Sequence, residues 1–415
     1  MKLESRTIIS GAIFIAIYTG FQGGRYFLAN RVQEIGILCA LSLFLYGAVM
    51  TALKIKKTEI RWNWWFFSTI FFVAYTFILP GYLFSVNNGV AMMPSVFASR
   101  EFLITMLCPG LYFLYRLGFS VEDMEHIFLV ALVSLVLSYV FHYVRMDLKA
   151  AYFSPDPTVS GLITFDEWRG FRLKTPSVAF YLLSVMAPML AYYSSEKSKK
   201  IAWILMCCLL IWIWLLVSQR SMAASLIAAT LAYHMMFAEK PRLGVFFMIL
   251  PGASVGIWMG VESSIEHLSQ LDPENDGVRF KSYTIAWESI KRYPLLGFGM
   301  QSSATLTEQK IFWYKFFSAD IGIIGIAYKF GLIGAFLYLV FSYFLLQRLL
   351  NTLWLYKKKF NRVNFSMLAL FIVCLGFTLN IALTPVYTYI PGLTAASFGI
   401  AITSIWLEKL RKLPG

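Results

Sequence analysis

Residues 201–217 decide the fold class, because they read Ile-Ala-Trp-Ile-Leu-Met-Cys-Cys-Leu-Leu-Ile-Trp-Ile-Trp-Leu-Leu-Val without a charged residue. An α-helix needs about 17–25 apolar residues to cross a bilayer, so this run is long enough. Similar runs recur along the 415 residues, of which 59% are hydrophobic and 14% charged. In soluble domains, about 45–50% of the residues are hydrophobic and about 25% are charged. The sequence therefore predicts an all-α polytopic membrane protein and excludes a soluble globule.

Apolar runs between charged residues predict about twelve membrane-spanning helices in a single integral membrane domain over residues 1–415. Prolines interrupt three of these runs, which membrane helices tolerate when neighbours satisfy the freed backbone groups. The first run has no small-residue cleavage site before Gln22, so we expect an uncleaved first span. The expected spans lie near residues 7–24, 35–53, 64–84, 99–116, 126–144, 176–193, 201–217, 221–237, 243–260, 320–346, 364–383 and 391–407.

Basic residues divide the loops between the two sides of the membrane. Twelve spans place both termini on one side, and that side carries 20 of the 36 Lys and Arg residues, mostly in short loops. By the positive-inside rule this side is cytoplasmic, including the 347–363 loop. The rule explains most of the net charge of +14, so we expect no nucleic-acid partner. The five cysteines lie in apolar runs and predict no disulfide framework.

Two connections, 145–175 and 261–316, are long and predicted to be external. Long loops in a chain whose other loops are short are usually functional. In the second loop, Val278–Arg292 predicts an amphipathic helix that lies along the outer membrane surface. Its large apolar residues recur with a helical period at Phe280, Tyr283, Trp287 and Ile290.

Several classes of site lack their motifs. There is no Gly-x-x-x-x-Gly-Lys-Ser/Thr phosphate loop, and Gly297-Phe-Gly299 lacks the third glycine of a dinucleotide-binding turn. The four histidines form no zinc pattern, and the acidic turn at 272–276 lacks the glutamate that completes a calcium loop. We therefore expect neither a metal site nor a cofactor.

The segment from Val278 to Gly299 carries a recognisable pattern. It reads Val-Arg-Phe-Lys-Ser-Tyr-Thr-Ile-Ala-Trp-Glu-Ser-Ile-Lys-Arg-Tyr-Pro-Leu-Leu-Gly-Phe-Gly. An external helix with an Arg and a Trp that ends in a Pro-Leu-x-Gly-x-Gly turn resembles the O-antigen ligase and polymerase superfamily. Weaker resemblances to that family, over about residues 165–345 in all, are Phe171–Ala179 entering a span, Ser218–Ser221 at a span end, and the Gly-Leu-x-Gly motif in Phe330–Gly334.

The resemblance implies a glycosyltransferase of the bacterial inner membrane whose active site faces the periplasm or exterior. Its donor and acceptor would be glycans on undecaprenyl diphosphate among membrane lipids, with a chain-length regulator protein as a further partner. Negative charge collects on the departing diphosphate, so the site needs fixed cations, and the guanidinium fork engages phosphate oxygens in pairs. Arg220 and Arg279 are the expected catalytic cations. Each could instead be an ordinary charge at a span end or in a loop.

One position separates the two branches of the family. Family ligases carry a histidine eleven residues before the first glycine of Gly-Leu-x-Gly, and here that residue is Asp320. The departure favours a polymerase of lipid-linked repeat units over a ligase that transfers glycan to lipid A core. Asp320 could accept the proton of the attacking sugar hydroxyl or could cap a helix.

Five further residues are candidates for substrate binding. Lys329 lies deep in a predicted span, where a charge is costly enough to suggest a function, although it could also snorkel. Arg172 and Lys174 could add cationic surface, or be ordinary loop charges. Tyr283 and Trp287 on the external helix complete the expected site.

A transporter or flippase of lipid-linked sugars is the alternative from another class. Such a protein would also have about twelve spans and charges within the membrane. Secondary transporters often show two similar halves, and no such symmetry is visible in this sequence. The concentration of charge in two outer loops favours chemistry at the membrane surface.

Overall fold

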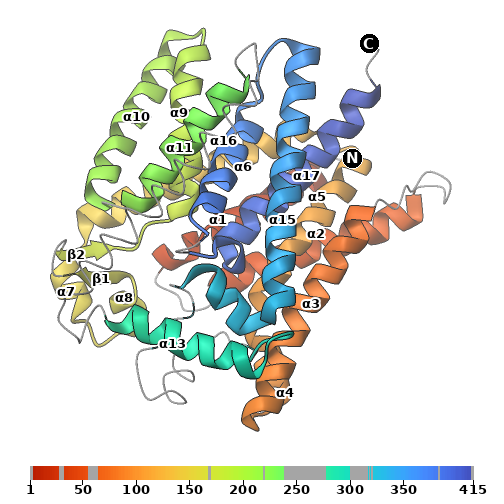
Figure 1. Cartoon of the computed structure of the whole chain (residues 1–415). Coiled ribbons are helices and arrows are strands. Elements are labelled where there is room, and N and C mark those ends of the chain that lie inside the picture. The colour runs from red at the N-terminus through yellow and green to blue at the C-terminus, as the bar shows by residue number, and fades with distance from the viewer. Residues whose placement is uncertain are drawn as a thin grey trace.

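The computed structural model describes residues 3–27, 32–54, 64–166, 170–217, 220–237, 277–299, 316, 318, 321–381 and 384–412. These residues are almost entirely helical, with one two-stranded antiparallel sheet (Figure 1). In chain order the elements are α1 (Leu3–Gly20), η1 (Gly23–Phe27), α2 (Val32–Lys54), α3 (Trp64–Asn88), α4 (Met92–Ala98), η3 (Arg100–Met106), α5 (Leu107–Arg116), α6 (Val121–Arg145), α7 (Leu148–Tyr152), α8 (Pro157–Ser160), β1 (Ile163–Asp166), β2 (Gly170–Leu173), α9 (Ser177–Tyr193), α10 (Lys197–Val217), α11 (Arg220–Phe237), α13 (Gly277–Arg292), α15 (Gly322–Phe360), α16 (Phe365–Leu379), η5 (Val386–Thr388) and α17 (Ile390–Lys412).

Helices occupy every predicted span except 243–260, which lies outside the described residues. Within the described ranges, six helices are long and apolar enough to cross a bilayer: α2, α3, α6, α10, α15 and α17. The apolar helices α9 and α16 are shorter. The predicted all-α polytopic membrane fold is thus confirmed.

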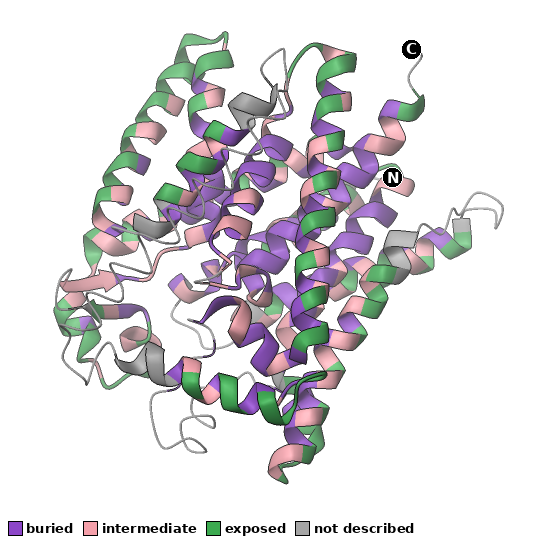
Figure 2. Ribbon diagram, viewed as in Figure 1, coloured by how far each residue is buried: buried purple, intermediate pink, exposed green. Residues whose placement is uncertain are grey.

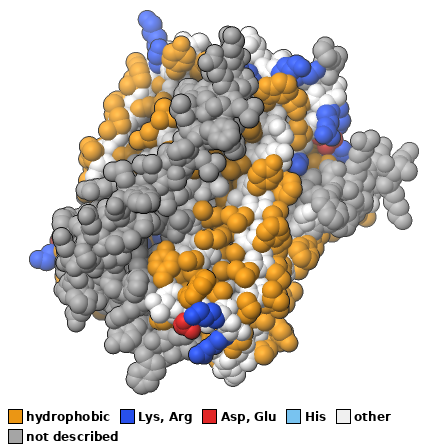
Figure 3. All heavy atoms as spheres, in the orientation of Figure 1, with side chains coloured by type: hydrophobic (Ala, Val, Ile, Leu, Met, Phe, Trp, Pro, Cys, Tyr) orange, Lys and Arg blue, Asp and Glu red, His pale blue; other side chains and the backbone are white. Residues whose placement is uncertain are grey.

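The surface carries the apolar band that a bilayer requires. Figure 3 shows hydrophobic side chains across the middle of one face, with most charged side chains above and below them. On α10, Leu205 and Leu215 are 63% and 74% exposed, and on α15 Phe336 is 63% exposed. Such exposure is unfavourable in water over so large an area, and it is expected where lipid covers the helices.

The centre of the molecule is α17, which is buried along almost its whole length (Figure 2). It contacts α1, α5, α6, α9, α15 and α16. Small residues such as Ala395, Ala396 and Gly399 let neighbouring helices approach closely, as is usual where helices pack in membranes. The rings of Phe128 and Phe398 stack with centroids 4.1 Å apart.

The two termini and the turns before α6 and α16 lie at one end of the molecule, here named the terminus end. Polar contacts tie it together: Arg116 pairs with Glu408 at 2.7 Å, and Lys409 with Glu122. The opposite end, here named the loop end, carries η1, the β1–β2 hairpin and α13, which runs along the lower edge of Figure 1. The predicted external segments that the structure describes therefore lie together and away from the termini.

Two expectations about the connections need correction. The predicted 347–363 loop is mostly helix, because α15 continues to Phe360 and the turn begins at Asn361 in a left-handed conformation. The 145–175 connection is not an open loop, since it contains α7, α8 and the hairpin. The hairpin pairs Ile163 with Leu173, and both side chains are buried in the main hydrophobic core, so the connection packs onto the helices.

Candidate functional site

The turn that follows α13, residues 294–299, fits into a break in α15. Gly331 has φ 70° and ψ −177°, which interrupts the helix at that residue. Four backbone hydrogen bonds join the turn to the break: Phe298 N to Tyr328 O (2.8 Å), Gly299 N to Lys329 O (3.1 Å), Leu332 N to Pro294 O (2.8 Å) and Ile333 N to Leu295 O (3.3 Å). The turn thus satisfies backbone groups that a continuous helix would pair internally.

Glycine is required on both sides of this junction. Gly331 and Gly297 have φ of 70° and 77°, a region that other residues rarely adopt. A Cβ on Gly331 would lie 2.0 Å from Leu295 O, and one on Gly297 would lie 2.4 Å from Gly331 N. The two glycine motifs found in the sequence are therefore the two halves of one junction.

Lys329 lies just before the break, with its side chain half-buried. The predicted span 320–346 is helical but contains a break, because Gly331 divides α15. Lys329 lies two residues before the break and inside the candidate span Gly322–Phe360, and its depth in the membrane stays a prediction. Its carbonyl is held by the 294–299 turn, so the junction fixes the position from which the side chain extends.

Three basic residues and one acid gather beside this junction, and we name Arg25, Glu101, Lys174 and Lys329 the cationic cluster. Glu101 of η3 interacts electrostatically with its neighbour Arg100, with Lys329 and with Arg25 of η1. Arg25 in turn acts on Lys174, which follows β2. The four residues come from four separate segments of the chain and carry an excess of positive charge.

Lys174 is held firmly in this cluster. Tyr26 donates its hydroxyl to the carbonyl of Lys174 at 2.9 Å, and the Lys174 ammonium donates to Gly161 O at 2.7 Å. Burial lowers the pKa of Lys174, and repulsion from Arg25 lowers it further. A bound anion would relieve both effects, because it would compensate the lost hydration and the repulsion.

Arg172 of β2 reaches a second corner of the loop end. Its Nη1 donates to the carbonyl of Val217, the last residue of α10, at 3.3 Å. Arg220 begins α11 only three residues later. The hairpin therefore brings Arg172 next to the chain segment that carries Arg220, although the two residues are far apart in sequence.

Three predicted catalytic residues have side chains outside the described part of the chain. Arg220 and Arg279 are placed by their backbones alone, at the starts of α11 and α13. Asp320 lies outside the described residues. The cap position of α15 belongs to Ile321, which has no side-chain cap hydrogen bond.

The predicted amphipathic helix 278–292 is confirmed as α13, but its buried face differs from the one expected. Ser282, Ala286 and Ser289 are buried together with Ile290, whereas Trp287 is 54% exposed. Small residues form this face because α13 packs closely on a small core: Phe316, Ile321 and Tyr328. Tyr283 packs against that core, so neither aromatic residue belongs to the cationic cluster.

Sequence reasoning missed Arg25 and Glu101. A signal was present for both: Arg25 follows two glycines directly after the first predicted span, and Glu101 falls inside the predicted span 99–116. A carboxylate within an apolar run is as costly as a lysine there, so Glu101 is a functional candidate for the same reason as Lys329. Arg100, its neighbour, is already paired with Glu34 at 2.9 Å.

Comparison with known proteins gives one family. A family model described as O-antigen ligase matches residues 201–339, a segment that holds α10, α11, α13 and the break in α15. The match supports the resemblance to the O-antigen ligase and polymerase superfamily and a function of that general type. It does not separate ligases from polymerases. No curated protein matches the chain.

Proposed function

We propose that this chain, whose residues 201–339 match the O-antigen ligase family, polymerises undecaprenyl-diphosphate-linked oligosaccharide units into a surface polysaccharide. The reaction would take place at the loop end, on the periplasmic or outer side of the bacterial inner membrane. Both long connections that were predicted to be external contribute to that end. The surrounding lipid would hold the polyprenyl chains of donor and acceptor.

The observation that carries the proposal is the cationic cluster. Arg25 and Lys329, from separate segments, lie near one acid, Glu101, and Lys174 lies near Arg25, all at one end of a membrane protein. Collecting like charges is unfavourable unless an anion compensates them. The diphosphate of a lipid-linked donor is an anion that the membrane holds at this depth. Arg172 extends the positive surface towards the start of α11.

The chemistry requires few groups. A hydroxyl of the acceptor glycan attacks the anomeric carbon of the donor, the bond from that carbon to the diphosphate oxygen breaks, and the diphosphate leaves with the electron pair. Arg220 and Arg279, with Lys329 and Arg172, stabilise the charge that develops on the diphosphate. Asp320 takes the proton of the attacking hydroxyl. No metal ion is needed in this scheme, because the basic side chains supply the positive charge.

Asp320 also favours the polymerase branch. Ligases of the family have a histidine at the corresponding position, and here a carboxylate replaces it.

Purified protein supplied with one lipid-linked repeat unit tests the proposal directly. With the undecaprenyl-diphosphate-linked unit alone, a polymerase gives a ladder of longer lipid-linked chains. The same donor mixed with lipid A core gives a core-linked product only if the protein is a ligase.

Each outcome distinguishes between the candidates. A ladder from the donor alone supports polymerisation. A product formed only with lipid A core contradicts the polymerase and supports a ligase. Unchanged donor in both reactions, with donor moved across the bilayer of a proteoliposome, favours a flippase.

A further inference from the structure

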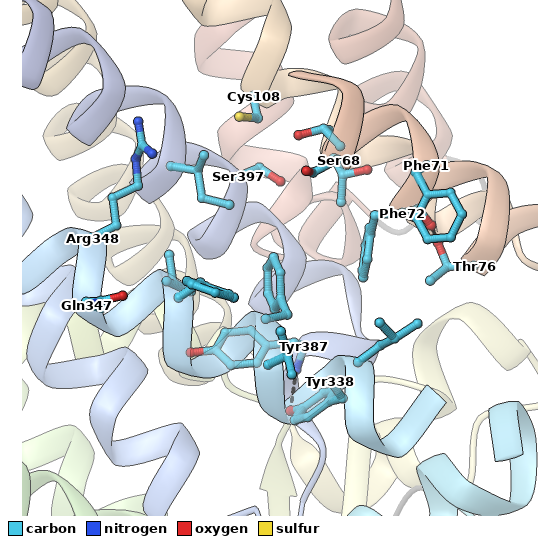
Figure 4. Close-up of a pocket in the computed structure, with 18 of the residues that line it drawn as sticks. Ser68, Phe71, Phe72, Thr76, Cys108, Tyr338, Gln347, Arg348, Tyr387 and Ser397 are labelled. Atoms are coloured by element: carbon cyan, nitrogen blue, oxygen red, sulfur yellow. Dashed lines mark hydrogen bonds between the residues drawn. The ribbon is translucent and has the colours of Figure 1, made fainter. Parts of the chain in front are cut away.

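A large cavity lies between α3, α15 and α17 and extends from the junction, at Phe330, towards the terminus end, at Arg348 (Figure 4). Its volume is about 1210 Å³, more than most small-molecule pockets, which hold about 300–1,000 Å³. Aromatic and aliphatic side chains form most of its wall, among them Phe72, Tyr338 and Phe341. Because the wall is apolar, the cavity suits a hydrocarbon chain.

One end of the cavity is basic. Arg348 of α15 lines it and donates from Nε to Thr403 Oγ1 at 3.2 Å and from Nη2 to Ser404 Oγ at 2.8 Å. Arg411, near the end of α17, lines the same cavity. No Asp or Glu is among the lining residues, and neither arginine forms an ion pair within the described ranges. Two cations thus border an apolar cavity with no acid to balance them.

The basic end lies beside residue types that favour a membrane interface. Gln347, Asn351 and Trp354 line the cavity near Arg348, and the Lys358 ammonium lies 5.4 Å from the centroid of the Trp354 ring. Tryptophan and lysine together are typical of the headgroup region. From Gly334 to Arg348 the helix rises about 21 Å, more than the roughly 15 Å that one leaflet contributes to the hydrocarbon core.

We propose that this cavity binds an anionic glycerophospholipid from the leaflet at the terminus end. The phosphate would contact Arg348 and Arg411, and the acyl chains would lie along Phe72, Tyr338 and Phe341. The two hydroxyls on α17 hold the Arg348 guanidinium in place, so its remaining nitrogen can meet a phosphate without rearrangement. The two arginines lie at the basic end of the cavity, whereas its opposite end is lined by Phe102 and Phe330, the chain neighbours of Glu101 and Lys329 in the cationic cluster.

The basic end decides between this lipid and a polyprenyl chain. A polyprenyl tail that entered from the loop end would leave Arg348 beside hydrocarbon without an anion, which is costly in lost solvation. An anionic phospholipid that enters from the terminus end compensates both charges and fills the apolar wall with its chains.

The test measures which lipids stay bound. The protein is reconstituted in bilayers of equal phosphatidylglycerol and phosphatidylethanolamine, extracted in mild detergent and examined by native mass spectrometry. We expect wild-type protein to retain phosphatidylglycerol in preference to phosphatidylethanolamine. Arg411→Gln should weaken that retention about fivefold, the effect of one basic side chain at an anionic membrane surface. Val340→Trp, which narrows the cavity and keeps both arginines, should also reduce it.

Arg362→Gln is the matched control, because Arg362 has the same charge at the same end but lies outside the cavity. It should retain phosphatidylglycerol as the wild type does. Equal retention of the two phospholipids, or the same loss in Arg362→Gln as in Arg411→Gln, would overturn the proposal. Recovery of a polyprenyl phosphate in place of phospholipid would overturn it too. Arg411 is exposed, so its substitution should not disturb folding.

Discussion

At the scale of single residues, the loop end depends on contacts between positions far apart in sequence. Arg172 and Lys174 belong to one short segment, yet Arg172 reaches the end of α10 while Lys174 meets Arg25. The sequence predicts both as charges of one long loop. It could not predict their different partners. These follow from the register of the hairpin and from the hydrogen bond between Tyr26 of η1 and Lys174.

The lowered pKa of Lys174 gives a prediction about pH. Burial and Arg25 hold the pKa of this group below the ordinary 10.5 of lysine, so it loses its charge earlier than a free lysine as pH rises. Affinity for a diphosphate should therefore fall as pH increases through that lowered pKa. In Lys174→Arg the charge persists, so the fall should be absent from this range. The check is to measure donor dissociation constants across the alkaline range for both proteins. Identical pH profiles would refute this role for Lys174.

At the scale of elements, the junction between the 294–299 turn and α15 explains why two glycine motifs occur together. The sequence predicts the helix α13 from its period, and it identifies both motifs as unusual. It does not show that they touch, since Gly297 and Gly331 are separated by more than thirty residues and each could end a helix by itself. Nor does it show which face of α13 is buried, because the periodic large residues include the exposed Trp287.

Gly331→Ala should destabilise the protein. The alanine would adopt a φ of 70° and meet Leu295 O, and such strain and overpacking together cost at least about 2 kcal/mol. The melting temperature in detergent, followed by loss of helical circular dichroism, should fall by several degrees. Gly11→Ala is the matched control, because a Cβ there meets nothing within 4 Å. Equal melting temperatures for the two variants would show that the junction is not under the constraint described.

At the scale of the whole molecule, sequence hydropathy and charge were sufficient for the fold class and for most helices. They did not predict the full length of α15, which has 39 residues, because its last turns are rich in lysine and lysine-rich segments are typical of loops. Long side chains of lysine extend towards water from a helix end, so charge marks the edge of the membrane and not the end of the helix.

Topology can be measured in intact cells. With the loop end outside, Glu288→Cys on α13 should react with a membrane-impermeant thiol reagent, because Glu288 is exposed there. Lys358→Cys, at the opposite end of α15, should be protected until the membrane is permeabilised. Labelling of position 358 in intact cells would contradict this orientation and indicate the opposite one.

The proposed reaction should not depend on divalent metal. The charge on the departing diphosphate is balanced by basic side chains, so EDTA should leave purified activity nearly unchanged. Activity lost in EDTA and restored only by magnesium or manganese would require a different description of the site.

The most direct test of the central claim compares turnover with donor binding in Arg279→Ala and Arg220→Ala. If both arginines stabilise charge as the diphosphate departs, loss of either should reduce kcat by roughly 100- to 1000-fold while the donor dissociation constant changes much less. Arg→Lys should restore only part of the rate, because lysine lacks the paired geometry. Arg292→Ala, on the exposed last turn of α13, is the control and should behave as wild type. Polymerisation at the wild-type rate in both Arg279→Ala and Arg220→Ala would contradict the account.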